Sequence, residues 1–413
     1  MPPENLTAAS LLANFGVPSW VSEFTHAPNQ EVRFGPGVAM EVGRLVAAMN
    51  VHRVLVVTDP GLAATGHLRR VVESLEMAGL TVGTFTDVRE NPTTHVVEAC
   101  VAEARRCDAQ ALIGLGGGSS MDAAKGCNFI LTNGGHMQDY WGVGKATLPM
   151  LPFIAIPTTA GTGSECQSFA LISDAETHAK MACGDKKAAA CLALLDPELT
   201  LTQPAMVTRL TGIDAMAHAL ESAVSTKSNE ISLAYSLAAF GLLAVGFPAV
   251  LSDPANLHAR AQMLLGAALA GVAIENSMLG AAHAAANPLT AQFQVVHGEA
   301  VGVMMPRILR CNLLSPEAHA TYQKLAQKIG RQADDLPRWF EELLELAGLP
   351  DHLRHWGISE AHVAALASEA AQQWTGMFNP VAVVEDDFRK FYYETLNAPP
   401  PFSGSSSAQA SIH

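Results

Sequence analysis

The pattern of hydrophobic and polar positions changes near the middle of the chain and divides it into two halves. In the first half, short aliphatic runs bounded by turn residues predict strands at Val54–Thr58, Thr81–Phe85, Ala111–Leu115 and Phe153–Ile156. Between them, residues 66–78 and 93–106 show the i, i+3, i+4, i+7 spacing of amphipathic helices, and another helix is expected from about Ser119. Alternating strands and helices of this kind predict a mostly parallel sheet with helices on both faces.

The second half contains long helical patterns rich in Ala, Leu and Met, and few candidate strands. Residues 231–246 and 256–275 are the best examples. The change falls near Pro204, so we expect an α/β domain at residues 1–204 and an all-helical domain at 205–397. The Pro- and Ser-rich segment 398–413 is expected to be a disordered tail.

Composition narrows the class of protein. With 49% hydrophobic and 15% charged residues, the 413-residue chain can form large cores, and a net charge of −14 argues against nucleic acid as a partner. Seven scattered Cys without a C-x-x-C pair, and no signal-like N-terminus, favour a reducing cytoplasm. The most apolar stretch, Ser236–Leu251, is short for a membrane span and contains Pro248, so we interpret it as a buried helix.

A glycine-rich turn follows the predicted strand at Ala111–Leu115. Its sequence is Gly116-Gly117-Gly118-Ser119-Ser120, directly before the next helix. Glycines allow close approach to the backbone, and free N–H groups at a helix start favour an anion such as a pyrophosphate. Ser119 or Ser120 could also cap the helix. The alternative is a tight turn that needs glycine for geometry alone.

Two other polar segments also follow predicted strands. Asp59 could accept hydrogen bonds from an adenosine ribose and repel a 2′-phosphate, although a turn residue before Pro60 is the simpler interpretation. The segment 157–165, PTTAGTGSE, provides a hydroxyl-lined loop that could donate hydrogen bonds to a nucleotide or simply face solvent.

The clearest chemical pattern lies in the helical half. Asp214 and His218 are four residues apart, which places both on one face of a helix, and His283 and His297 follow in later apolar segments. One carboxylate and three imidazoles suit Fe²⁺ or Zn²⁺. Because the chain has 15 His, any single one is more often a structural residue than a ligand.

Four segments together resemble the iron-containing alcohol dehydrogenase family, which is similar in fold to dehydroquinate synthase. They are GGGSSMDAAK, IPTTAGTGSE, GIDAMAHALES and AAHAAANPLTAQFQVVHGEAVGVMMP, and the resemblance covers roughly residues 30–395. It implies an α/β dinucleotide-binding domain, an all-helical domain and a metal in the cleft between them. It also implies hydride transfer between NAD(H) and a small alcohol or aldehyde, and a homodimer or larger homo-oligomer.

The resemblance also assigns residues. It places the metal ligands, and with them the catalytic centre, at Asp214, His218, His283 and His297. It places NAD-binding residues at Asp59, Asn91, Gly117, Gly118, Ser119, Asp122, Thr158, Thr159, Thr162 and Lys180. Asp59 at its position is typical of members that use NAD rather than NADP.

One position departs from the family pattern. Many members have a proton-carrying His four residues after the third ligand, where this chain has Asn287. Since Asn cannot carry a proton as imidazole does, we assign no general acid or base and expect the proton to leave through water, the cofactor ribose and hydroxyls such as those of Thr158 or Thr162.

Two other functions remain as alternatives. A non-redox lyase on the same fold would need Lys or Arg near the metal helices for an anionic substrate, and segments 212–221 and 279–300 contain none. A regulatory protein that binds metal and NAD without turnover is suggested only by Asn287.

Phe169, Trp374 and Phe378 could line an apolar pocket, although core packing is the simpler role.

Overall fold

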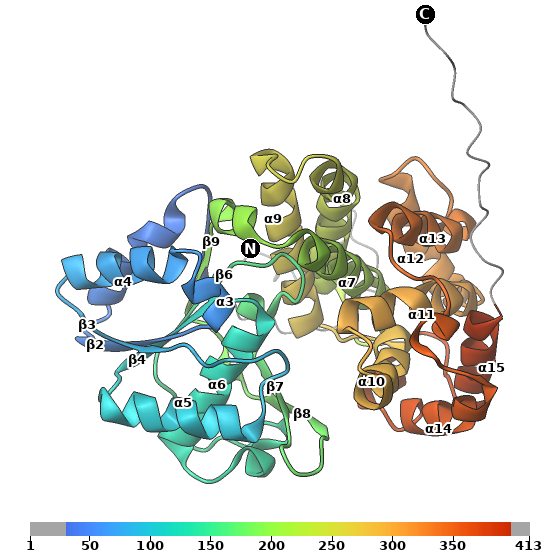
Figure 1. Ribbon diagram of the computed structural model, residues 1–413. Helices are drawn as coiled ribbons and strands as arrows, with labels where there is room; N and C mark the ends of the chain where they lie inside the picture. The colour runs from blue at the N-terminus through green and yellow to red at the C-terminus, as the bar shows by residue number, and fades with distance from the viewer. Residues whose placement is uncertain (1–29, 398–413) are drawn as a thin grey trace, which may run out of the picture.

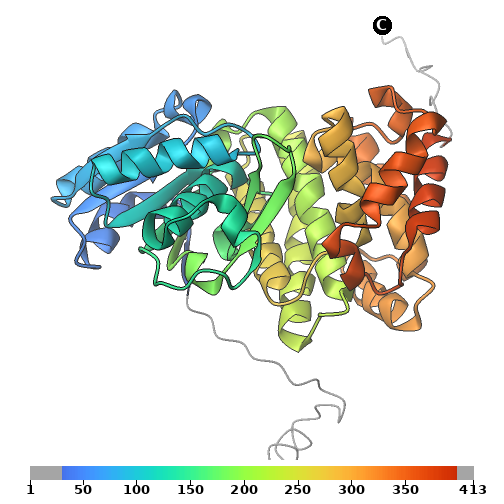
Figure 2. The same cartoon turned by 90° about the horizontal axis from the view of Figure 1, so that it is seen from below.

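A computed structural model describes residues 30–397 of the protein (Figure 1). The N-terminal half is an α/β layer structure and the C-terminal half is entirely helical, and the two lie side by side (Figure 2). This confirms the predicted fold class. The expected tail at 398–413 lies outside the described residues.

The main sheet has six parallel strands. Their order across the sheet is β1 (Glu31–Phe34), β9 (Leu192–Leu195), β6 (Phe153–Pro157), β4 (Ala111–Gly116), β2 (Arg53–Val57) and β3 (Thr81–Phe85). The four strands expected from sequence are present within one or two residues. The four-residue strands β1 and β9 were not predicted, because each is too short to show a pattern and depends on its neighbours.

Helices cover both faces of this sheet, and successive side chains of each strand point to opposite faces. Val54 and Val56 belong to a core with α2 (Val42–Ala47) and α4 (His67–Met77), whereas Leu55 and Val57 pack with α5 (Thr94–Arg106) and α6 (Gly118–Asn133). The short helix α3 (Pro60–Ala63) follows β2. A second, three-stranded sheet was also not predicted and has the order β5 (Gly142–Val143), β8 (Lys180–Gly184) and β7 (Phe169–Ser173).

The helical half begins with α7 (Ala205–Val224). It continues through α8 (Glu230–Ser252), α9 (Leu257–Glu275), α10 (Ala281–Phe293), α11 (His297–Asn312), α12 (Pro316–Gln327), α13 (Leu336–Ala347), α14 (Glu360–Ala370) and α15 (Glu385–Leu396). Its core also contains Ala160, Cys166, Ala193 and Leu195 from the α/β half. The two halves therefore share packed apolar surface at their junction.

Helices α8 and α9 are long and apolar enough to cross a membrane by length and composition alone. The helix that contains Ser236–Leu251 extends further at its start than the apolar stretch suggested, and Pro248 lies inside it. Both helices pack against α7 and contribute Phe240, Phe247, Met263 and Leu264 to the helical core. The fold buries 61% of the apolar window of α9 but only 39% of that of α8, so the expectation of a buried helix at Ser236–Leu251 holds only in part.

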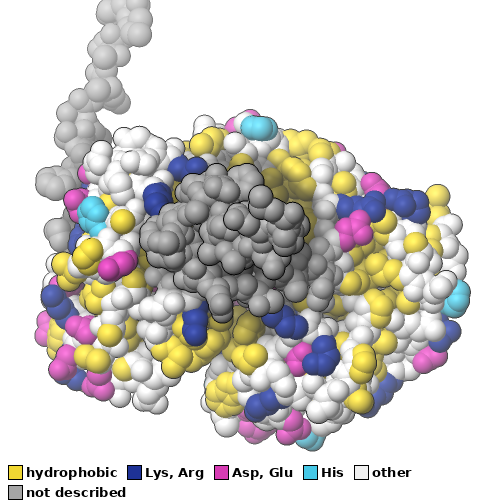
Figure 3. Space-filling view, turned by 180° about the vertical axis from the view of Figure 1, so that it is seen from behind, with side chains coloured by type: hydrophobic (Ala, Val, Ile, Leu, Met, Phe, Trp, Pro, Cys, Tyr) yellow, Lys and Arg dark blue, Asp and Glu magenta, His cyan; other side chains and the backbone are white. Residues whose placement is uncertain are grey.

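Surface charges are mixed in sign. On the face shown in Figure 3, Lys and Arg side chains are interspersed with Asp and Glu and separated by apolar and uncharged surface. On this face, the described residues thus form no surface of a single charge sign.

Candidate metal and cofactor site

Helix α7 carries the first two candidate ligands. Asp214 and His218 lie one helical turn apart on a segment that is buried from Gly212 to Val224. Such burial of two ionisable side chains is costly unless they are paired or bind a metal. The apolar residues around them explain why the helix is buried, and the two polar residues mark one face of it.

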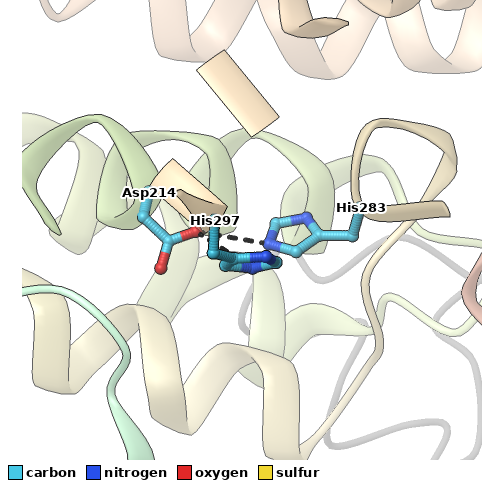
Figure 4. Close-up of side chains that lie close together, drawn as sticks. All are labelled: Asp214, His283 and His297. Carbon is cyan, nitrogen blue, oxygen red and sulfur yellow. Dashed lines mark ion pairs between the residues drawn. The ribbon is translucent and has the colours of Figure 1, made fainter. Parts of the chain in front are cut away.

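Helices α10 and α11 bring His283 and His297 to the same place (Figure 4). The Nε2 atoms of His218, His283 and His297 lie 3.4, 3.5 and 3.7 Å from the same atom, Oδ1 of Asp214. Two ligands of a tetrahedral ion with bonds of about 2.1 Å are about 3.4 Å apart. The distances therefore fit four ligand atoms arranged around one cation.

The remaining ring nitrogens orient these imidazoles. Nδ1 of His218 donates to the carbonyl of Gly161 at 3.3 Å, and Nδ1 of His283 donates to the Glu221 carboxylate at 2.5 Å. Both rings then direct Nε2 toward Asp214. Within residues 30–397, Oδ1 of Asp214 and Nε2 of His283 are buried atoms with no hydrogen-bond partner. A divalent metal would satisfy both, so the residues fit the group.

Electrostatics in the pocket favour an ionised Asp214. Burial raises its pKa, but the three imidazoles outweigh burial and hold the pKa below its usual value. Burial lowers the pKa of His297 to about 3, which leaves that ring neutral and able to ligate. The His297 side chain is 29% exposed, compared with 5–7% for Asp214, His218 and His283, so the pocket opens on the His297 side.

The cofactor candidates lie at the carboxyl edge of the parallel sheet. Strand β2 has β3 on one side and β4 on the other, so the chain changes direction across the sheet between β2 and β4. A crevice outside such a switch point is where open α/β sheets bind nucleotides. Asp59 follows β2 and the glycine turn follows β4, which places both at this crevice.

The glycine turn packs against the second polar loop. A Cβ on Gly117 would lie 3.2 Å from Oγ1 of Thr159, and one on Gly118 would lie 2.9 Å from Cγ2 of Thr162. The expected serine cap is wrong, because Gly117 is the N-cap of α6 and no side chain caps it. The first N–H groups of the helix are therefore left for a ligand, as an anion site requires. Ser119 lies in the first turn of α6.

Asp59 is both a turn residue and a part of the crevice. Its Oδ1 accepts a hydrogen bond from the Leu62 N–H at 2.9 Å and caps α3. Its Oδ2 would be 3.6 Å from a Cβ built on Gly116, a residue with φ of +148°. One carboxylate oxygen thus has a structural role, while the other lies beside the turn.

The remaining cofactor candidates, Asn91, Asp122 and Lys180, take part in two hydrogen-bonded groups. Nζ of Lys180, at the start of β8, donates to Oδ1 of Asn91 at 3.3 Å. Asp122 on α6 accepts a hydrogen bond from Oγ of Ser164 at 3.0 Å, and burial raises its pKa to about 6. The field of Lys180 acts on both Asp122 and Asp214, so this lysine lies between the cofactor and metal groups.

The threonine loop joins the two halves of the molecule. The N–H of Thr158 donates to the Gly116 carbonyl at 3.0 Å, and Oγ1 of Thr162 accepts from the Ser164 N–H at 3.3 Å. Gly163, with φ of +62°, lies so close to α9 that a Cβ would be 2.7 Å from Cα of Gly271. The loop therefore contacts the glycine turn on one side and the metal-binding half on the other.

Asn287 lies one turn after His283 on α10, and the aromatic residues lie on the segment Trp374–Phe378 and on β7. Nδ2 of Asn287 donates to Oε1 of Gln373 at 2.9 Å. Trp374 stacks on Phe169 of β7 with ring centroids 6.0 Å apart and meets Phe378 edge-on at 5.7 Å. The aromatic group thus connects the two halves, and Trp374 within it is 38% exposed.

Several residues of the site were missed from sequence. Glu221 lies seven residues after Asp214, so its place on the same helical face was a usable signal. Lys125 is fully buried and donates to Ser164 and to the carbonyl of Phe169, three residues after Asp122 in the same helix. Nothing in the sequence indicated that the Gly161 carbonyl would support His218.

Comparison with known families covers nearly all of the described chain. Residues 29–197 match the family described as iron-containing alcohol dehydrogenase. Residues 208–396 match the C-terminal part of the Fe-containing alcohol dehydrogenase family. The match thus includes both the nucleotide crevice and all four candidate ligands.

Individual relatives agree with this. The chain is 32% identical over 367 residues to alcohol dehydrogenase 4 of Schizosaccharomyces pombe, covering 88% of this chain and 87% of that one. A crystal structure of 1,3-propanediol oxidoreductase superposes with a TM-score of 0.87 at 29% identity, covering 91% of this chain and all of that one. Sulfoacetaldehyde reductase from Bifidobacterium kashiwanohense, in complex with NAD⁺, superposes with a TM-score of 0.84 at 28% identity, covering 92% and 100%. The chain therefore belongs to the iron-containing alcohol dehydrogenase family and is an NAD-dependent alcohol dehydrogenase.

Proposed function

We propose that the chain transfers hydride between a small primary alcohol and NAD at a ferrous ion held by Asp214, His218, His283 and His297. The observation that supports this is the arrangement of three Nε2 atoms around one oxygen of Asp214, at 3.4 to 3.7 Å. Zinc is the second choice, because the same ligands suit both ions. A divalent metal there supplies Lewis acidity toward the oxygen of an alcohol or aldehyde.

The residues of the chain have separate tasks in this proposal. Asp214 supplies a buried negative charge, and the neutral His297 keeps a lone pair available on the open side of the pocket. The glycine turn and the Thr158–Thr162 loop would hold the pyrophosphate and nicotinamide ends of NAD. The proton would leave through hydroxyls such as those of Thr158 and Thr162, because the Asn287 amide can only donate or accept hydrogen bonds.

A neutral substrate fits the charges around the pocket. The segments 212–221 and 279–300 carry no Lys or Arg, but the charge of Lys180, a residue expected at the cofactor, reaches His297 from the α/β half. Its ammonium group donates to Asn91 and is attracted by the carboxylates of Asp122 and Asp214, which offset its charge. An alcohol or aldehyde without a phosphate group is therefore the proposed substrate class.

The same proposal includes a homodimer in the cytoplasm. Strand β1 is at one end of the six-stranded sheet, and among residues 30–397 it pairs only with β9. Its Val32 and Phe34 are exposed, and an exposed apolar edge strand favours pairing with a second copy. All seven Cys are free, as expected in a reducing compartment.

The test is a screen of purified protein, depleted of metal and then loaded with Fe²⁺ under anaerobic conditions or with Zn²⁺. NADH formation is measured with primary alcohols of increasing chain length. We expect turnover to depend on metal and to be higher with iron. Tight binding of NAD and metal without turnover of any alcohol or aldehyde would support a regulatory protein instead and overturn the proposal.

A further inference from the structure

Glu221 lies behind the metal pocket and has both carboxylate oxygens engaged. It is on the same face of α7 as Asp214 and His218 and is 1% exposed. Its Oε2 accepts a hydrogen bond from Nδ1 of His283 at 2.5 Å, and its Oε1 accepts one from the Ala282 N–H at 2.7 Å. An ionised carboxylate is an acceptor only, so both neighbours must act as donors.

The contact with His283 determines which ring nitrogen carries the proton. A neutral imidazole has one N–H, and the Glu221 carboxylate draws it to Nδ1. Nε2 then has a free lone pair, and it is directed toward Oδ1 of Asp214 at 3.5 Å. The opposite tautomer would place a hydrogen where the metal must bind and would leave Nδ1 facing a carboxylate without a proton.

The contact with Ala282 fixes the helix that carries the ligand. Helix α10 begins after Gly280, which has no side chain to cap it. Glu221 instead accepts a hydrogen bond from one of the first N–H groups of the helix. Asn379 accepts the neighbouring one, from Ala281, at 3.3 Å. A Cβ on Gly280 would lie 3.0 Å from both Oε1 of Glu221 and Oδ1 of Asn379, so glycine is needed for this approach.

We propose that Glu221 is a positioning residue that fixes the tautomer and orientation of the ligand His283 through its contact from α7. The inference rests on the proposed metal site. A carboxylate behind a metal-bound imidazole generally affects metal affinity by about 10–100-fold. Capping of α10 alone would stabilise the fold without affecting the tautomer, so the two roles can be separated.

The variant Glu221→Gln separates them because an amide has one acceptor and one donor group. If its oxygen keeps the bond to Ala282, its NH₂ faces Nδ1 of His283 and moves the ring proton to Nε2. We expect metal affinity, measured by competition with a chromophoric chelator, to fall about 10–100-fold. The ¹⁵N shifts of His283 in metal-free protein, recorded at about pH 10 so that the ring is neutral, should report the Nε2–H tautomer, while the unfolding temperature changes little.

The matched control is Asn379→Ala, which removes the other half of the same cap and does not contact His283. It should lower the unfolding temperature of the metal-free protein, keep the Nδ1–H tautomer and leave metal affinity within about threefold of the wild type. Equal losses of affinity in E221Q and Asn379→Ala would reduce Glu221 to a helix cap and overturn the inference. So would an E221Q protein that retains wild-type affinity and the Nδ1–H tautomer.

The wild-type protein provides a readout that needs no variant. Its metal-free form should be studied at about pH 10, because the burial of His283 is outweighed by Glu221 and Asp214, which raise its pKa to about 9. The neutral ring should then be protonated at Nδ1, and a neutral ring protonated at Nε2 would overturn the inference even if E221Q failed to fold. Absence of metal binding by the wild type would instead contradict the proposed function, and the tautomer measurement would still decide the role of Glu221.

Discussion

The metal pocket and the nucleotide crevice are built from different parts of the chain. In the pocket, side chains hold side chains: His283 is fixed by Glu221, and the three imidazoles surround Asp214. In the crevice, backbone does most of this work, and Gly117 and Gly118 bring the start of α6 against Thr159 and Thr162. Metal binding in the pocket should therefore be most sensitive to charge and to the histidine tautomer. Cofactor binding in the crevice should be most sensitive to side-chain volume.

Buried carboxylates show the same contrast. Burial alone would raise the pKa of Asp214, but three imidazoles more than offset it. Near the crevice, burial outweighs the local compensation and raises the pKa of Glu165 to about 7 and that of Asp122 to about 6. A buried acid thus stays ionised only where the fold surrounds it with positive or polarisable partners.

The largest effect is expected from His283→Ala. Removing one of four ligands should lower metal affinity by more than about 100-fold, because even residues behind a ligand contribute 10–100-fold. Metal content and NADH formation should be lost together. The control is His319→Ala, since this half-exposed imidazole only faces Asp334. Full activity in a metal-free His283→Ala protein would contradict the metal assignment.

A change of volume should have the next largest effect, in the crevice. In Gly118→Ala the new Cβ would lie 2.9 Å from Cγ2 of Thr162, so the loop must shift at a cost of about 1–3 kcal/mol. We expect the KM for NAD⁺ to rise about tenfold while metal content stays the same. Gly241→Ala on α8 is the control, because its Cβ would meet only the flexible Lys328 side chain. An unchanged KM would remove Gly118 from the cofactor site.

Asp59→Gly tests a charge placed within the region where volume should dominate. Losing the carboxylate should reduce the preference for NAD⁺ over NADP⁺ by about tenfold, or about 1.4 kcal/mol, in the ratio of kcat/KM values. The loss of the α3 cap should cost only a few tenths of a kcal/mol, because glycine is tolerated at this position. If the ratio does not change, Asp59 is only a turn residue.

Much of the fold followed from local pattern. Strands such as β2 and β4 are continuous apolar runs, and α4 and α5 have one apolar face, so each is visible without its neighbours. Strands β1 and β9 are four residues long and exist because they pair with each other and with the sheet. The pairing of β7 with β8 likewise depends on contacts that sequence spacing does not reveal.

The site was predictable to the extent that its residues share a helix. Asp214 and His218 follow from i, i+4 spacing, whereas placing His283 and His297 beside them required the family resemblance, because three helices must meet. The expected cap by Ser119 or Ser120 failed because Gly117 begins the helix in an extended conformation. Side-chain partners across helices, such as Glu221 and His283, depend on packing that a single sequence does not display.

The smallest expected effect sharpens the contrast between the carboxylates and concerns stability. Burial raises the pKa of Glu165 from 4.5 in the unfolded chain to about 7 in the fold, so the folded protein retains a proton that the unfolded chain loses. Stability contributed by this group is present below about pH 4.5 and falls, by at most about 1.4 kcal/mol per pH unit, as pH rises to about 7.

Glu165→Gln removes this dependence because an amide does not ionise. The measured quantity is the unfolding temperature of the variant minus that of the wild type. This difference should increase by about 2 °C between about pH 5 and about pH 8. Only the change with pH matters, since the buried amide has its own constant cost. Asp174→Asn is the control and should show no change over this range, because hydrogen bonds from the Thr177 backbone and Gln138 hold the pKa of Asp174 at about 2, and its contribution to stability is lost only as the pH falls from about 4 to about 2. A temperature difference independent of pH in Glu165→Gln would show that Glu165 is compensated as Asp214 is, and the contrast between the two regions would then lie in volume alone.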